Sequence, residues 1–168
     1  MKKTNKQKYE AYDEADWEKA YFDEQTQGFV VIHNLHGKGE RSGNFQIAQR
    51  LAILGFMVEL LPVSPQTSVD SCIDEEFWEF KTTSGSVSSV QTRLREGKEQ
   101  SDKILLSFPK ERPLGDILRG IISSINMDKS RKIQTVGLLF DKELVRWTRS
   151  EILKRDFKKL KPYLDIKE

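Results

Sequence analysis

Hydrophobic and polar positions along the chain follow two different periods. Short runs of β-branched and aromatic residues are typical of strands, whereas apolar residues three and four positions apart are typical of helices. The runs predict strands at 29–33, 56–61, 77–82, 104–108 and 133–140, a short apolar stretch at 69–73, and a hairpin partner strand at 144–148. The wider spacing predicts helices at 7–24, 40–54, 87–102, 113–126 and 150–159.

The alternation of these elements predicts the fold class. Strands that alternate with helices favour an α/β fold, here a mixed central sheet flanked by helices. Gly28 is expected to end the first helix, so residues 1–27 are interpreted as an N-terminal helical extension. Residues 28–168 then form one α/β domain, since 168 residues suit a single compact core.

Composition narrows the class of protein further. Apolar residues make up 37% of the chain and aromatic residues 10%, which is enough to supply a core and argues against global disorder. No apolar run approaches the roughly 18 residues of a membrane-spanning helix, so no membrane partner is predicted. The one cysteine, Cys72, excludes an internal disulfide framework and a cysteine-based zinc cluster. A reducing cytoplasm is the predicted compartment.

Charge is distributed unevenly along the chain. Residues 129–168 carry twelve Lys and Arg against six Asp and Glu, whereas residues 1–28 carry five against seven. A basic C-terminal quarter is compatible with a polyanionic partner such as nucleic acid, although a solvated helix face has the same composition.

The predicted strand 77–82 carries the most informative chemistry. Side chains alternate across a strand, so Trp78 and Phe80 are expected to pack in the core while Glu79 and Lys81 share the opposite, displayed face. Asp70 lies upstream, far enough to return beside Glu79. Two converging carboxylates suit Mg²⁺ or Mn²⁺, with Zn²⁺ as an alternative, and a lysine beside them can position water and stabilise charge on a phosphate.

These residues resemble the restriction-endonuclease-like nuclease superfamily. Asp70 followed by Glu79-Phe80-Lys81 matches its P-D…(D/E)-x-K pattern, with Val69 where proline is frequent. The predicted elements from 40 to 108 also follow the superfamily order of helix, strand, strand, helix and strand. In that superfamily the first helix often supplies a further acid, which implies a catalytic role for Glu40 or a site role for Asn44 on the same helix face.

A closer resemblance covers about residues 28–157. It rests on five places in the sequence: Phe29-Val30-Val31-Ile32-His33, Val58-Glu59-Leu60-Leu61-Pro62, Asp70, Trp78-Glu79-Phe80-Lys81 and Gln100. Together they resemble the C-terminal tRNA nuclease toxin domain of contact-dependent growth inhibition proteins. The resemblance implies that Asp70 and Glu79 bind the metal, that Asp70, Glu79 and Lys81 are catalytic, and that Gln100 lies near the substrate.

Further residues are candidates for substrate binding. Thr82 and Thr83 follow the lysine strand at once, and His33 precedes the predicted helix that holds Asn44. Arg146 and Arg149 lie in the basic quarter. Each has a structural alternative: a strand-end histidine bonded to backbone, a turn threonine or an ordinary surface charge. His36 is interpreted as structural, Cys72 as a core residue and Asp74 to Glu76 as a solvated turn.

The sequence therefore predicts a metal-dependent endonuclease acting on RNA, with tRNA favoured, in the cytoplasm or delivered into a target-cell cytoplasm. An immunity protein is the expected partner of a toxin. Two alternatives stay open: a DNA nuclease of a mobile element, and an inactive module of the same fold that binds nucleic acid or protein.

Overall fold

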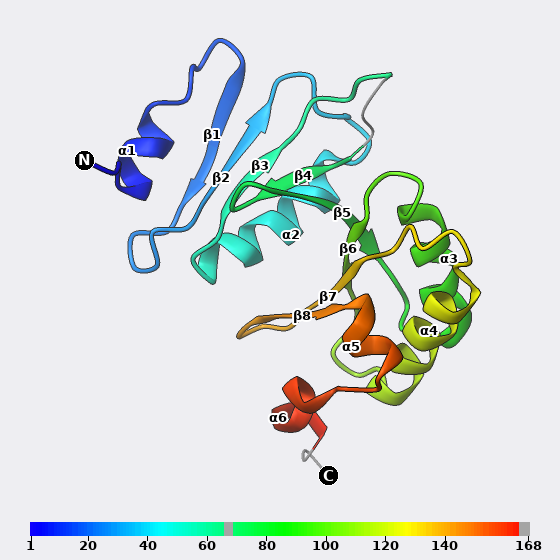
Figure 1. Ribbon diagram of the computed structural model, residues 1–168. Coiled ribbons are helices and arrows are strands. Elements are labelled where there is room, and N and C mark those ends of the chain that lie inside the picture. Colours follow the sequence, from blue (N-terminus) through cyan, green and yellow to red (C-terminus); the bar gives the residue numbers. More distant parts are fainter. Residues whose placement is uncertain (66–68, 165–168) are drawn as a thin grey trace. The chain divides into compact units, whose positions relative to one another are not determined.

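The computed structural model describes residues 1–65 and 69–164 (Figure 1). Tertiary contacts gather the chain into two compact units, Met1–Trp78 and Glu79–Glu168, here termed the first and second unit. This division falls inside one strand and differs from the boundary between residues 27 and 28 that the sequence predicts.

The first unit is built around a central, fully buried strand. It contains α1 (Asn5–Glu10), β1 (Trp17–Phe22), β2 (Phe29–His33), α2 (Arg41–Ile53), β3 (Met57–Leu60), β4 (Ser71–Ile73) and the start of β5 (Glu76–Thr82). Strand β2 pairs antiparallel with β1 and parallel with β3, and the two hairpins β3–β4 and β4–β5 are antiparallel. Residues 29–32 are all buried, since β2 has a strand on each side and both α1 and α2 pack on it.

Helix α2 packs closely on this part of the sheet. Its buried residues are Asn44, Ile47, Ala48, Leu51 and Ala52, which lie at helical spacing. A Cβ at Gly28 would lie 1.9 Å from the Ala52 carbonyl oxygen, so only glycine allows the strand to begin this close to the helix.

The turn between β4 and β5 has mirror-image backbone geometry. Asp74 and Glu75 have φ values of 45° and 71°, as a two-residue hairpin requires for the right-handed twist of its strands. The Asp74 carboxylate also accepts a 2.9 Å hydrogen bond from the Met57 N–H. The solvated turn predicted at this place is confirmed.

The helix predicted at 7–24 is wrong. Helix α1 ends at Glu10, and Trp17–Phe22 is strand β1, which pairs with β2. Aromatic residues at 9, 12, 17 and 21 fit a helical spacing roughly, but the open edge of β2 offers backbone hydrogen bonds that local periodicity does not reveal. The ring of Tyr9 packs 5.3 Å from that of Phe29, which ties α1 to β2.

The second unit continues β5 into a parallel arrangement. It contains α3 (Val87–Gly97), β6 (Lys103–Ser107), α4 (Leu114–Met127), β7 (Thr135–Leu139), β8 (Leu144–Thr148), α5 (Arg149–Leu153), η1 (Lys158–Leu160) and α6 (Lys161–Leu164). Strands β5, β6 and β7 are parallel, with α3 and α4 as the crossover helices, and β8 returns antiparallel to β7.

The core of the second unit lies between these strands and the two crossover helices. Val90 and Leu94 of α3 and Ile117 and Ile121 of α4 pack with residues of β6, β7 and β8. The helices approach closely at Gly120, where a Cβ would lie 2.7 Å from that of Val90. Trp147 of β8 is fully buried in this core.

The predicted fold class is confirmed. In each unit, parallel and antiparallel strands pair in chain order as a mixed sheet, with helices beside it (Figure 1). Helix 87–102 is shorter than predicted and ends at Gly97, and the helix predicted at 150–159 ends at Leu153. Residues 66–68 of the predicted loop 62–68 lie outside the described residues. Within 1–65 and 69–164, no helix is long and apolar enough to cross a membrane.

Candidate functional site

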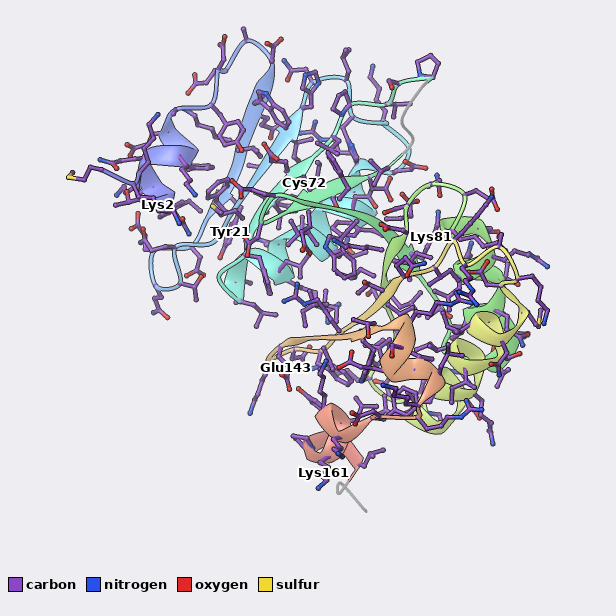
Figure 2. All side chains as sticks on the ribbon, viewed as in Figure 1. Lys2, Tyr21, Cys72, Lys81, Glu143 and Lys161 are labelled. Atoms are coloured by element: carbon purple, nitrogen blue, oxygen red, sulfur yellow. The ribbon has the colours of Figure 1, made fainter. Side chains whose placement is uncertain are left out.

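A charged pair on β5 is the centre of the candidate site. Lys81 Nζ lies 2.8 Å from Glu79 Oε1 (Lys81 is labelled in Figure 2). The Glu79 side chain is 1% exposed and that of Lys81 is 19% exposed. The two residues are two positions apart on one strand, so their side chains point to the same face and can form an ion pair within that strand.

The strand positions this pair through its neighbours. Glu79 and Lys81 lie in register with Ile104 and Leu106 of β6, which belong to the core packed against α3 and α4. Residues in register on adjacent strands share a face, so the charged pair lies on the helix-covered side of the sheet. Trp78 and Phe80 point to the other side and are buried, as predicted.

The burial of Glu79 corrects one expectation. The sequence predicted that Glu79 would be displayed, but its carboxylate lies inside, beside an apolar row of β6. A buried carboxylate is costly unless it is paired, and the Lys81 ammonium supplies the opposite charge. The partly exposed lysine is therefore the solvent-facing member of the pair.

The two threonines after Lys81 have different surroundings. Thr82 is exposed at the end of β5, in register with Ser107. Thr83 is buried, its N–H donates to the Ser107 carbonyl at 2.9 Å, and its hydroxyl donates to Ser89 Oγ at 2.9 Å. The Thr83 hydroxyl also accepts from the Gly85 N–H, so this side chain fixes the turn that leads into α3.

Asp70 belongs to the first unit. It is 8% exposed and directly precedes β4, and its carbonyl accepts a 2.9 Å hydrogen bond from the Leu61 N–H. Its predicted catalytic and metal-binding roles stay predictions.

A buried polar pair that the sequence did not reveal joins Asn44 to His36. His36 Nδ1 lies 2.5 Å from the Leu61 carbonyl oxygen, and Asn44 Nδ2 lies 3.2 Å from His36 Nε2. Because a carbonyl only accepts, Nδ1 donates, and in the tautomer that fits both contacts Nε2 accepts from the amide of Asn44. Asn44 thus holds the 33–40 loop against α2, while its predicted substrate role stays a prediction.

Glu40 and His33 lie at the two ends of the 33–40 loop, and their predicted roles in catalysis and substrate binding stay predictions. Glu40 is the exposed residue before α2, and its carbonyl accepts from the Asn44 N–H, which confirms that the two lie one helical turn apart. His33 Nδ1 accepts a 3.1 Å hydrogen bond from the Leu35 N–H, and its ring packs edge-on against Trp17 at 4.8 Å.

The predicted substrate roles of Gln100 and Arg146 stay predictions, although Gln100 lies outside the helix that was predicted to hold it. Gln100 follows the end of α3, in a turn where its N–H donates to the Gly97 carbonyl, rather than on the helix. Arg146 lies in register with Gly137, a position on the opposite face of the sheet from the residues that align with Glu79.

Arg149 is a structural residue in the second unit. Its guanidinium donates to Asp128 Oδ2 at 2.9 Å and to the carbonyl oxygens of Ile133, Ile125 and Asp128 at 3.0 to 3.1 Å. These bonds satisfy the C-terminal end of α4, where carbonyls otherwise lack partners. The predicted contact of Arg149 with substrate stays a prediction.

Asp128 is the second buried acid of this unit. It accepts from the Ile133 N–H at 2.9 Å, and Lys98 Nζ lies 3.4 Å away. Burial raises the pKa of the Asp128 carboxyl, but the Ile133 N–H and the cations of Arg149 and Lys98 outweigh it and hold that pKa below its usual range. No spacing in the sequence marked this cluster, since its members come from three separate segments.

Comparison with known proteins gives a limited result. No family model matches the chain, and no curated protein matches it. A chain of the solved CdiA-CT/CdiI toxin and immunity complex from Burkholderia pseudomallei is similar over 68% of this chain and 91% of that one, with 15% identity and a TM-score of 0.46. A likeness of this degree carries no conclusion about function.

Proposed function

We propose that this protein is a metal-dependent endonuclease that hydrolyses phosphodiester bonds in RNA, with tRNA as its preferred substrate. The observation that supports the proposal best is the buried Glu79 carboxylate with the Lys81 ammonium 2.8 Å away. An acid held in the interior beside a partly exposed lysine is a preorganised charged group, the kind of arrangement that stabilises charge in a reaction.

The donor set fits a hard divalent cation. Mg²⁺ is typically held by one or two carboxylates and completed by substrate phosphate and water. Glu79 supplies one carboxylate, and Asp70 is the second by prediction. Among residues 1–65 and 69–164 no three His, Cys, Asp or Glu side chains gather into a metal cage. We propose that substrate phosphate and water supply the remaining ligands. When bound, the metal neutralises charge on the scissile phosphate.

Lys81 is the residue proposed to meet the substrate. Its ammonium has three donors, of which Glu79 takes one. A second can position the attacking water, and a third can donate to a non-bridging phosphate oxygen. In the hydrolysis, the water oxygen forms a bond to phosphorus and the bond to the leaving ribose oxygen breaks. One water proton reaches that leaving oxygen through solvent.

The choice of RNA and the toxin role rest on the sequence resemblance and the basic C-terminal quarter. We propose that the protein acts in the cytoplasm, either where it is made or in a target cell. In the toxin case an immunity protein would bind it.

Cleavage assays with matched variants test the proposal. Purified protein is incubated with total tRNA and with plasmid DNA, in Mg²⁺, Mn²⁺, Zn²⁺ or EDTA. The variants are Glu79→Gln, Lys81→Met and Asp70→Asn, and the control is Lys142→Met, an exposed lysine in the β7–β8 turn. Circular dichroism and thermal unfolding establish that each variant is folded.

Each outcome has a clear meaning. Metal-dependent cleavage of tRNA that is lost in Glu79→Gln and Lys81→Met, and kept in Lys142→Met, supports the proposal. Unchanged cleavage in both variants overturns it. Preferential cleavage of plasmid DNA would make DNA the substrate in place of RNA. If folded protein leaves both nucleic acids intact in every metal, the proposal that the protein is an endonuclease is overturned.

A further inference from the structure

A groove in the second unit lies where α4 ends and α5 begins. It encloses about 690 Å³ and is lined by the 126–134 segment and by residues at the start and end of α5. Its solvent-facing polar residues are Asn126, Lys129, Arg131, Gln134, Ser150 and Lys154, all of which are exposed. We term it the α4–α5 groove.

The charges in this groove do not cancel. Asp128 and Arg149 also line it, but they pair with each other at 2.9 Å. Lys129, Arg131 and Lys154 make no ion pair with any acid among residues 1–65 and 69–164. By contrast, nearby Lys132 is paired with Glu99 at 2.6 Å, and Lys159 with Glu151 at 3.0 Å. Three uncompensated cations thus converge on one concave surface.

The end of α4 does not offset this positive charge. A helix C-terminus carries a partial negative charge from its free carbonyls. Here the Arg149 guanidinium donates to the Ile125 and Asp128 carbonyl oxygens, which removes two of those acceptors. The fold therefore neutralises the negative elements of the groove and leaves the exposed cations at its rim.

We propose that the α4–α5 groove binds the sugar–phosphate backbone of the RNA substrate. This inference rests on the proposed function and adds the surface that holds the substrate. Phosphate oxygens would accept from the three cations. The amide of Asn126 and the hydroxyl of Ser150 can donate to and accept from ribose 2′-hydroxyls, groups that an acidic protein partner does not have.

Binding without cleavage is the direct test. Fluorescence anisotropy measures the affinity of labelled tRNA in EDTA, at several salt concentrations. The groove variant combines Lys129→Gln, Arg131→Asn and Lys154→Gln. Asparagine is chosen at 131 because that residue has a φ of 55°, a left-handed conformation that asparagine tolerates.

The control variant removes three charges elsewhere in the same unit. It combines Lys142→Gln, Lys158→Gln and Lys161→Gln, which are also exposed. Net charge is therefore the same in both variants, and only its place differs. Thermal unfolding establishes that both are folded.

The groove variant is expected to bind tRNA about 10-fold or more weakly, with the slope of log affinity against log salt reduced by about 2. The control variant should change much less. Equal losses in the two variants, or no loss in the groove variant, overturn the inference. Equal binding of polyglutamate, with the same loss in the groove variant, overturns the RNA assignment in favour of an acidic protein partner.

The design separates this inference from the proposed function. If tRNA binds through the groove but is never cleaved in any metal, the endonuclease proposal fails and the binding surface stands. If the groove variant binds and cleaves tRNA normally, the groove inference fails and the endonuclease proposal stands.

Discussion

Among its residues up to 164, the second unit holds two buried carboxylates with contrasting partners. Asp128 is paired with Lys98, at the end of α3, and with Arg149, at the start of α5. Glu79 is paired with Lys81, two residues along the same strand. The ion pairs of Asp128 join three segments that are distant in sequence, whereas the ion pair of Glu79 lies within one strand. Long-range pairing suits a residue that maintains the fold, and a local pair leaves its lysine available for chemistry.

Removing the charge of Asp128 should have the largest effect. The variant Asp128→Asn leaves Lys98 and Arg149 without their counter-charge in a buried place, so it should lower the free energy of unfolding by about 3 kcal/mol or more. Urea and thermal unfolding measure this. Asp116→Asn, which breaks the surface pair with Arg119, is the matched control and should cost less than about 1 kcal/mol. A similar loss of unfolding free energy in the two variants would contradict the structural role of Asp128.

Glu79→Gln should separate activity from stability. Cleavage is expected to fall about 100-fold or more, which corresponds to about 2.7 kcal/mol in the barrier. Its unfolding midpoint should drop less than that of Asp128→Asn, because the partly exposed Lys81 can turn toward water. Glu76→Gln, at the exposed start of the same strand, serves as control. A folded, fully active Glu79→Gln protein contradicts the proposed site.

Acid should weaken the fold through Asp128. The pKa of this carboxyl is lower in the folded protein than in the unfolded chain, so its contribution is complete above the unfolded value of about 3.9 and is lost as pH falls through the folded value. Unfolding free energy measured from pH 6 to pH 2.5 should decline less steeply in Asp128→Asn than in the natural chain. Parallel curves would show that other groups carry the acid sensitivity.

The smallest expected effect concerns the thiol of Cys72, which is buried beside a carboxylate. Burial first, and then the Glu59 carboxylate, raise the pKa of the Cys72 thiol to about 11 (Cys72 is labelled in Figure 2). At pH 8 the thiol is therefore almost wholly protonated and should react with a disulfide reagent much more slowly than free cysteine. Absorbance of the released thiolate measures the rate. Rapid reaction in the folded protein would show that Cys72 is accessible and ionised.

Local pattern predicted the parts of the fold whose cause is local. The strand at 29–33, the helix predicted at 40–54 and found at 41–53, and the burial of Trp78 and Phe80 followed from periodicity. Strand β1 did not, because its partner β2 decides its structure. The exposure of Glu79 was also misjudged, since alternation assigns a face but does not say what covers it.

The candidate site shows the same limit. The Glu79–Lys81 contact was predictable because two residues on one strand at a spacing of two share a face. The pair of His36 with Asn44 and the bonds of Arg149 to the end of α4 were not, because each depends on loops that meet only in the folded chain. Arg149 was consequently interpreted from its charge alone.

The bonds of Arg149 also bear on the order in which the chain can fold during synthesis. A ribosome releases α4 and Asp128 before it releases Arg149, which lies 21 residues after Asp128. Until Arg149 emerges, the carbonyls at the end of α4 lack its guanidinium as a donor, and the Asp128 carboxylate lacks one of its two cationic partners. The second unit is therefore expected to close only after the β7–β8 hairpin has left the exit tunnel, in a late, cooperative step rather than helix by helix.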